Sequence, residues 1–160
     1  MRTLVLAAAA ALLVAGCSAE PETPPPPPSI DFSVAAKTVS AKPFLYCTVE
    51  INECKRDTTA QVELRAAPGT PVRVRVPKEV AATPWSVVIQ YRTAAGEQRE
   101  PETVATFGPG KQDTFEAKPP TAGDQLQTVE VKQAGAKLVQ GESGPEPVTR
   151  GVWSAAVEPA

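Results

Sequence analysis

The chain has 160 residues, of which 16 are lysine or arginine and 18 are aspartate or glutamate, so its formal net charge at pH 7 is −2. A charge this close to zero argues against nucleic acid as a partner and against strong attraction to an anionic membrane surface. Histidine is absent, which excludes Ser-His-Asp and Cys-His catalysis and most zinc and copper sites. We therefore expect no catalytic residue, no metal and no cofactor.

The N-terminal segment, residues 1–16, is predicted to be a lipoprotein signal peptide. An apolar run of about eleven residues follows Arg2, which suits a signal peptide and is too short to span a bilayer. The run ends at Val14-Ala15-Gly16-Cys17, which resembles a bacterial lipobox. Cys17 is thus the predicted site of diacylglycerol or palmitate attachment, anchoring the protein on the extracytoplasmic side of the cell membrane. An ordinary cleaved signal with a chance cysteine is the alternative.

Residues 17–29 are predicted to be a linker, because Pro24 to Pro28 are five consecutive prolines that cannot join a packed core. In polyproline II, at about 3.1 Å per residue, this linker reaches roughly 35 to 40 Å. We expect a stiff stalk that lifts the domain above the lipid headgroups. A proline-rich ligand for a partner domain is the alternative. The stalk leads into one domain over residues 30–160.

Two cysteines remain once Cys17 is assigned to lipid, and they are Cys47 and Cys54. An oxidising compartment favours a disulfide between them. Because the closed loop holds only about eight residues, the bond is expected to pin one local hairpin or loop with roughly 2.5 kcal/mol. The Cys-x-x-Cys spacing of redox enzymes is absent.

The domain is dominated by period-2 alternation, which is typical of strands. Val72, Val74 and Val76 alternate with arginines, and a second run over residues 85–92 alternates large apolar side chains with smaller or polar ones. Weaker runs cover residues 30–36, 39–46 with an interruption at Pro43, 61–66, 103–107, 113–117, 125–133, 136–140 and 151–157. The pattern predicts an all-β domain, namely an antiparallel immunoglobulin-like β-sandwich.

Three aromatic residues are predicted to lie in the core of this sandwich: Trp85, Tyr91 and Trp153. Trp85 belongs to a central strand, and we expect Trp153 on the last strand to pack against it. A ligand-stacking platform built from Trp85 and Tyr91 is the functional alternative.

A cationic face is predicted from Arg65, Arg73, Arg75 and Lys78. These residues share one exposed face if the strands ending at residues 66 and 76 pair through the Pro68-Gly69 turn. Such a face suits phosphate headgroups or anionic glycans. A solubilising surface or a guard for an edge strand is the alternative.

The remaining motifs give little sign of catalysis. Gly108-Pro109-Gly110-Lys111 lacks the first glycine and the Ser or Thr of a phosphate-binding loop, so we expect a turn. Carboxylates gather loosely in two places, near the cysteine pair and around Gly96, and we expect solvated loop charges there. They are Glu50, Glu53, Glu97, Glu100 and Glu102.

Several blocks of the chain together resemble an uncharacterised actinobacterial family of small envelope lipoproteins, catalogued as a domain of unknown function. The blocks are Tyr46-Cys47 through Cys54, Pro68-Gly69, Val76-Pro77-Lys78-Glu79, Pro84-Trp85 and Gln90-Tyr91-Arg92. The resemblance implies attachment to the envelope and an immunoglobulin-like sandwich. It transfers no catalytic residue.

Tether, stalk and a domain without catalytic motifs predict a non-enzymatic lipoprotein that binds or scaffolds an envelope protein, lipid or glycan. One alternative is a carrier that holds a lipid in an apolar cavity of the sandwich. Another is a cell-wall hydrolase that uses the five scattered glutamates as acid and base.

Overall fold

The computed structural model describes residues 25–141 and 144–160. Within these ranges the chain forms eleven β-strands and one short helix, arranged in two sheets whose strands are antiparallel except for one pair. The predicted all-β class is therefore confirmed. The predicted signal peptide over residues 1–16 and the predicted lipidation site Cys17 lie outside the described residues.

The smaller sheet has four antiparallel strands in the order β2-β1-β6-β9. Its strands are β1 (Ile30–Val34), β2 (Lys37–Ala41), β6 (Val72–Arg75) and β9 (Thr114–Ala117). Val72 and Val74 are fully buried, whereas the arginines between them are exposed. This is the arrangement that the valine and arginine alternation predicts, because successive side chains of a strand point to opposite faces.

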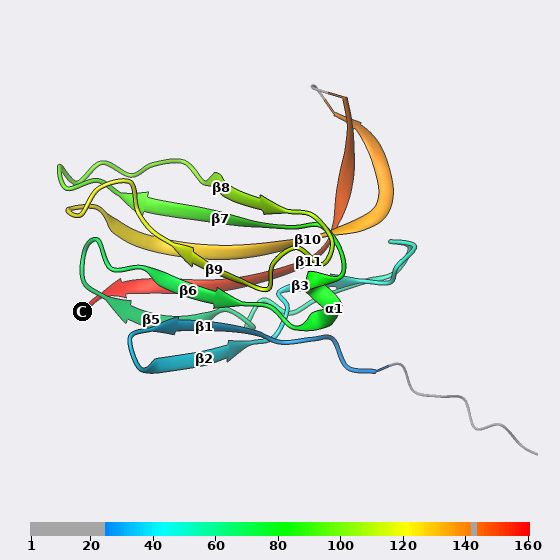
Figure 1. Cartoon of the computed structure of the whole chain (residues 1–160), viewed down its shortest axis with the longest axis horizontal. Coiled ribbons are helices and arrows are strands. Elements are labelled where there is room, and N and C mark those ends of the chain that lie inside the picture. The colour runs from blue at the N-terminus through cyan, green and yellow to red at the C-terminus, as the bar shows by residue number, and fades with distance from the viewer. Residues whose placement is uncertain (1–24, 142–143) are drawn as a thin grey trace, which may run out of the picture.

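The larger sheet has seven strands in the order β4-β3-β11-β10-β7-β8, with β5 added in parallel along β11. Its strands are β3 (Leu45–Cys47), β4 (Cys54–Arg56), β5 (Val62–Ala66), β7 (Trp85–Arg92), β8 (Glu102–Phe107), β10 (Gln125–Gly141) and β11 (Gly144–Pro159). β3 and β5 share one edge of β11, since they pair with different parts of it. The long hairpin of β10 and β11 is thus the centre of this sheet (Figure 1).

One hydrophobic core joins the two sheets. The cluster of buried residues includes Ile30 and Phe32 from β1 together with Val129 and Val131 from β10. In Figure 1, β6 and β9 of the smaller sheet lie over the β10 and β11 pair, and β1 and β2 continue the smaller sheet below it. Burying apolar faces of two sheets against each other removes both from water, which is the main favourable contribution to such a fold.

All three aromatic residues that we expected in the core are buried: Trp85, Tyr91 and Trp153 are 1%, 8% and 0% exposed. The two tryptophans, however, stack on different partners. The ring centroids of Trp85 and Phe107 are 4.4 Å apart, and those of Trp153 and Tyr46 are 5.9 Å apart. The expected pairing of Trp85 with Trp153 is corrected accordingly, because β10 lies between their strands.

Several boundaries differ from the expected ones. The run over residues 39–46 does divide at Pro43, as expected, but its first strand, β2, already begins at Lys37. A short helix, α1 (Lys78–Ala81), follows Pro77 where no helix was expected, and β4 forms opposite β3. The runs over 125–133 and 136–140 belong to one long strand, and residues 144–150 extend β11 although two prolines occur there.

Candidate functional site

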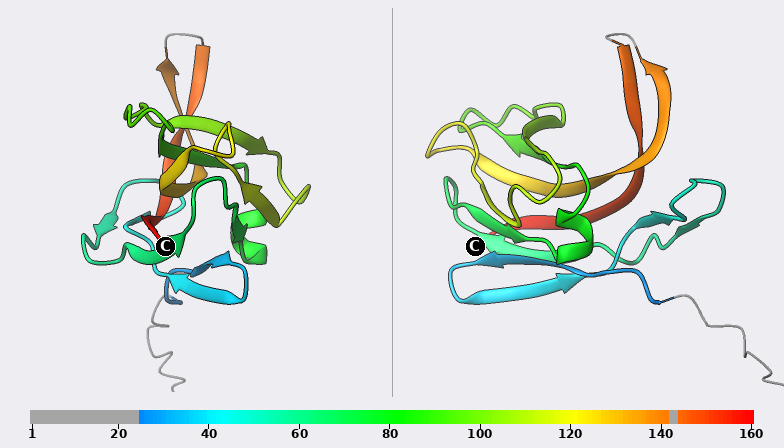
Figure 2. Two further views of the ribbon diagram at one scale, coloured as in Figure 1. Left: turned by 90° about the vertical axis from the view of Figure 1, so that its left-hand side faces the viewer. Right: turned by 45° about the vertical axis from the view of Figure 1, so that its right-hand side comes forward.

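The outer half of the β10 and β11 hairpin projects from the body of the protein. We call residues 134–141 of β10 and 144–150 of β11 the arm. The arm bends away from both sheets (Figures 1 and 2). Its apolar side chains are unusually exposed, with Leu138 62% and Val139 47% accessible. Because neighbouring residues of a strand point to opposite faces, each face of the arm presents one large exposed apolar side chain, and this favours the arm as an interaction site.

The bend has a local cause in the strand ladder. The register between β10 and β11 shifts between Gln133 and Ala134 and again between Ala134 and Leu138, and such irregularities bend and twist a strand pair. β10 also loses its other neighbour here, because the register of β7 with β10 ends at Trp85 opposite Gln133. Beyond this point the arm has no second strand on the β10 side within the described residues.

The buried amide of Gln133 fixes the start of the bend. Its side chain is 1% exposed, and Nε2 donates to Thr83 Oγ1 at 3.0 Å. The backbone N–H of Ala134 donates to the carbonyl of Pro84 at 2.8 Å. The arm therefore leaves the domain from an anchored position.

The β3–β4 hairpin, residues 45–56, supports the base of the arm, and we call it the brace. Cys47 and Cys54 stand directly opposite each other on its two strands and are joined by a disulfide with an S–S distance of 2.04 Å. This confirms the predicted disulfide and its local character. The brace extends from the same end of the protein as the arm (Figure 1).

Ile51, at the turn of the brace, contacts the arm. It has a φ of 55°, which is rare for a β-branched residue. A Cβ built on Gly135 would overlap Ile51 Cδ1 and approach the carbonyl oxygen of Val148 at 3.1 Å. Gly135 therefore leaves the space that the Ile51 side chain fills, and the strained backbone holds this side chain against the arm.

Arg150 makes a second connection between the arm and the brace. Its Nε donates to the carbonyl of Cys47 at 3.1 Å, and its guanidinium lies 4.9 Å from the centre of the Tyr46 ring. Tyr46 in turn meets Trp153 edge to face. The contacts thus continue from the arm through the brace into the core.

The predicted cationic face is not one surface. β5 pairs with β11 and β6 pairs with β1 and β9, so the strands before and after the Pro68-Gly69 turn belong to different sheets. Arg65 therefore lies on the larger sheet, and Arg73 and Arg75 lie on the smaller one. The expectation fails because the connection crosses between sheets instead of closing a hairpin.

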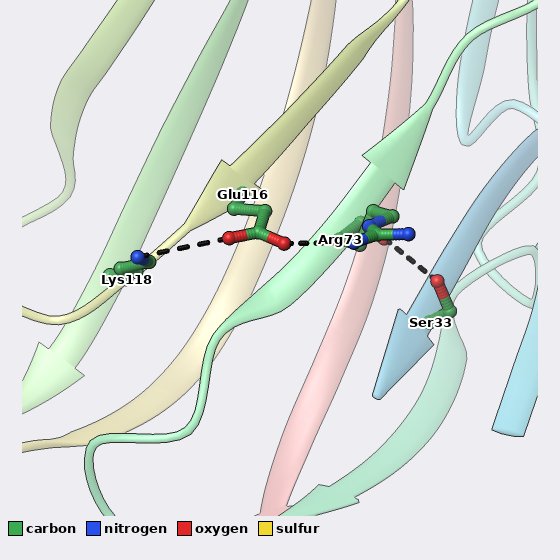
Figure 3. Close-up of polar contacts among 4 residues, drawn as sticks. All are labelled: Ser33, Arg73, Glu116 and Lys118. Atoms are coloured by element: carbon green, nitrogen blue, oxygen red, sulfur yellow. Dashed lines mark hydrogen bonds and ion pairs between the residues drawn. The ribbon is translucent and has the colours of Figure 1, made fainter. Parts of the chain in front are cut away.

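The three arginines also have acidic partners. Arg65 lies 3.5 Å from Glu158, and Arg73 lies 3.0 Å from Glu116. Figure 3 shows Glu116 between Arg73 and Lys118, with the Ser33 hydroxyl donating to the Arg73 carbonyl. The hydrogen bond from Arg73 lowers the pKa of Glu116. Cross-strand pairs of this kind reduce the net positive charge that an anion would meet.

Asp31 forms the corresponding pair with Arg75 on the neighbouring ladder. Arg75 Nη2 donates to Asp31 Oδ2 at 2.8 Å, and the Ser40 hydroxyl donates to Oδ1. The hydrogen bond from Ser40, followed by that from Arg75, lowers the pKa of Asp31.

Two open grooves of about 270 and 410 Å³ meet at Lys78 and Asp113. Arg75 lines the first groove and Lys111 the second, so two of the four predicted cationic residues, Arg75 and Lys78, lie close to each other here. Lys111 belongs to the predicted turn, in which Gly110 has a φ of 66° and donates to the carbonyl of Ala81 at 2.7 Å.

The carboxylates that we considered for hydrolysis do not form one site. Glu50 and Glu53 lie on the brace, whereas Glu97, Glu100 and Glu102 lie at the opposite end of the protein, where β7 and β8 are connected (Figure 1). All five are exposed. Among the described residues, no group of three acidic or cysteine side chains is placed to hold a metal ion. Within the described residues the one helix, α1, lacks the length and apolar character needed to cross a membrane.

The sequence predicted only part of the arm. The alternation over residues 136–140 predicted a strand, but nothing in the pattern separated its exposed apolar residues from core residues. Pairing of Leu138 and Gln140 with two prolines across the hairpin is decided by the tertiary structure. Ile51, Gly135 and Arg150 were missed because their roles depend on contacts between distant segments.

Comparison with known proteins identifies the family of the chain. No curated protein and no solved structure matches it. A family model described as "Protein of unknown function (DUF2771)" matches residues 23–158, which is well over half of the sequence. The resemblance to a family of unknown function that the sequence blocks indicated is thereby confirmed, and the chain belongs to the DUF2771 family.

Proposed function

We propose that the protein is a lipoprotein of the actinobacterial cell envelope, anchored by lipid at Cys17, which acts by binding or scaffolding a partner and not by catalysis. The lipobox-like Val14-Ala15-Gly16-Cys17 and the proline run that follows support the anchor and the stalk. Two sheets around one core support an immunoglobulin-like sandwich as the body that the stalk carries.

The observation that carries the binding role is the exposure of Leu138 and Val139 on a braced, projecting arm. A two-stranded ribbon is marginally stable in water by itself. This one is held in place by the Ile51 contact, by Arg150 and by the Cys47–Cys54 disulfide. The arm buries little of its own surface, yet three contacts hold it in place. This favours binding of a partner as the role of the arm.

The location of the arm fits a tethered protein. The linker enters the domain at the end that carries the arm and the brace, and the C-terminus lies at the other end (Figure 1). An anchor at Cys17 would therefore favour partners on the membrane side of the domain.

The experiment places a photo-crosslinking amino acid at Val139 in the full chain and isolates adducts from native membranes. Val104 is the matched control, since it is an exposed valine of β8 with 37% accessibility, against 47% for Val139. Reproducible adducts at Val139 but not at Val104 are expected. Equal or absent labelling at both positions would refute the binding role of the arm.

The anchor is tested separately by the intact mass of the protein from membranes, beside Cys17→Ala. A chain that begins at Cys17 with added diacylglycerol mass, lost in the variant, is expected. A soluble chain without acylation would refute the proposed location.

A further inference from the structure

The two edges of the arm differ in their capacity to accept another strand. On the β11 side, Pro145 and Pro147 stand opposite Gln140 and Leu138 of β10. Paired positions in an antiparallel ladder alternate between hydrogen-bonded and non-hydrogen-bonded pairs. Proline has no N–H, so these two pairs are of the non-hydrogen-bonded kind, in which the N–H position points away from the partner strand.

Because the two prolines are two residues apart, both remove a hydrogen-bond donor from the outer edge of β11 only. Both lie at positions whose N–H would face outward, and the ladder inside the arm loses no donor. The β11 edge is thereby blocked against addition of a strand, which is a common protection of edge strands.

The β10 edge carries no such protection. By the same alternation, the backbone N–H and C=O groups of Leu138 and Gln140 face outward on this side. Neither residue is a proline, and within the described residues no strand pairs with β10 beyond the register that ends at Gln133. One edge of the arm is closed and the other is open.

We propose that the open β10 edges of two copies of this chain pair antiparallel, so that two arms form one four-stranded sheet around a two-fold axis at Leu138. The inference rests on the proposed function, in which the arm is the binding element. A two-fold interface requires an edge that is complementary to itself. The segment 136–140 meets this requirement.

With the axis at Leu138, this residue faces its own copy, Lys137 faces Val139 of the second copy, and Ala136 faces Gln140. No like charges stand opposite each other. Pro147 is the partner of Leu138 within the arm, so one face of the joined sheet carries an apolar row of Pro147 and Leu138 from both copies. The exposed Leu138 would then be partly covered by Leu138 of the second copy.

The other face is complementary in charge. Glu146 is the partner of Val139 within the arm, so in the joined sheet it shares a row with Lys137 of the second copy. The two-fold axis produces this row twice. Val139 stands between these two opposite charges, which are about 10 Å apart at the strand spacing, so their attraction adds a small contribution in favour of this register.

The experiment uses the full chain in membranes and compares Leu138→Cys with Val104→Cys. Facing residues of a hydrogen-bonded pair are about 5.5 Å apart at Cα, a distance that a disulfide can bridge. Rapid formation of a covalent dimer through residue 138, and not through residue 104, is expected. Equal rates at both positions would overturn the proposal.

Gln140→Pro provides a test that leaves the inner ladder of the arm intact, because residue 140 already faces a proline. In the Leu138→Cys background this change removes one outward donor from each copy and should weaken dimerisation roughly thirtyfold. Pro145→Ala, which alters the other edge, should leave the crosslinking rate unchanged. An unaffected rate in Gln140→Pro would refute pairing through the β10 edge.

The two proposals fail in different ways. If Val139 labels a different protein and Leu138→Cys gives no dimer, the arm binds a partner and the inference of a second copy is wrong. If neither position gives an adduct, both proposals are wrong.

Discussion

The indole Nε1 of Trp153 donates a 2.9 Å hydrogen bond to the carbonyl oxygen of Pro28. Trp153 is fully buried in β11, and Pro28 is the last of the five consecutive prolines. The bond fixes the point where the linker ends and the domain begins. Because Trp153 also meets Tyr46 of the brace, the linker end and the base of the arm share one buried residue.

Trp153→Phe should lose this hydrogen bond while it keeps most of the packing. We expect the free energy of unfolding to fall by about 2 kcal/mol, because the lost hydrogen bond and the space that the smaller ring leaves in the core contribute comparable amounts. Proteolysis within residues 25–29 should become faster, because the linker end is no longer held. Urea denaturation and limited proteolysis measure the two effects. An unchanged proteolysis rate would show that the bond does not hold the linker.

Gly151→Ala should destabilise the domain, because a Cβ at this position would lie 2.5 Å from Cη2 of the buried Trp153 ring and 3.2 Å from Tyr46. Overpacking of this kind costs about 1 to 3 kcal/mol. Gly108→Ala is the matched control, since its Cβ would meet only Lys111 Cγ at 3.7 Å. Thermal unfolding of both variants should show a loss for Gly151→Ala alone, and equal melting temperatures would contradict the packing argument.

Removal of the disulfide by Cys47→Ser with Cys54→Ser should lower the free energy of unfolding by about 2.5 kcal/mol, given a closed loop of about eight residues. The brace would also hold the arm less firmly, so amide exchange over residues 136–140 should become faster. Reduction of the wild-type protein should reproduce both effects. If exchange in the arm stayed at the wild-type rate, the brace would not support the arm.

Ile51→Ala tests the contact between the brace and the arm directly. Loss of the side chain that faces Gly135 should increase amide exchange over residues 136–140 severalfold, because the arm opens locally at lower cost. Val49→Ala, on the same turn and 52% exposed, is the control and should change nothing. An equal response of both variants would locate the effect in the turn itself.

Asp31 should make stability depend on acidic pH. Its pKa is lowered in the folded protein by the hydrogen bond from Ser40 and then by that from Arg75. The stability contribution is therefore fully present above the unfolded-state pKa of about 3.9 and is lost as the pH falls through the lower folded-state pKa. Ser40→Ala should raise the pKa of Asp31 and reduce this acid-dependent loss.

Carboxyl titration by NMR and urea denaturation between about pH 2 and pH 6 measure both quantities for this prediction. Ser33→Ala is a suitable control, since the Ser33 hydroxyl donates to the Arg73 carbonyl and not to Asp31. A pKa of Asp31 that is the same in Ser40→Ala and in wild type would contradict the assignment of Ser40 as the main cause.

Alternation in the sequence was sufficient to predict most strands of the core. The Val and Arg repeat of β6 and the alternating run of β7 predict the observed burial, because successive side chains of a strand point to opposite faces. The local disulfide was predictable for a similar reason, since two cysteines seven residues apart can only close a short loop.

Which strands pair could not be read in this way. Arg65 and Arg73 are separated by one turn in the sequence, yet they lie on different sheets, because the chain crosses over the core between β5 and β6. Periodicity describes the faces of one strand and contains no information about its neighbours. The predicted cationic face failed at this step.

The sequence by itself determined the all-β class, the buried aromatic residues, the local disulfide and the family. These follow from short-range patterns of burial and from matched sequence blocks. Only the tertiary structure decided that residues 134–141 and 144–150 leave the core as an arm, that Ile51 fills the space above Gly135, and that Trp153 holds Pro28. The last two relations join segments that are far apart in the chain, and the first depends on which strands lie beside β10 and β11. Such contacts are fixed by packing in three dimensions.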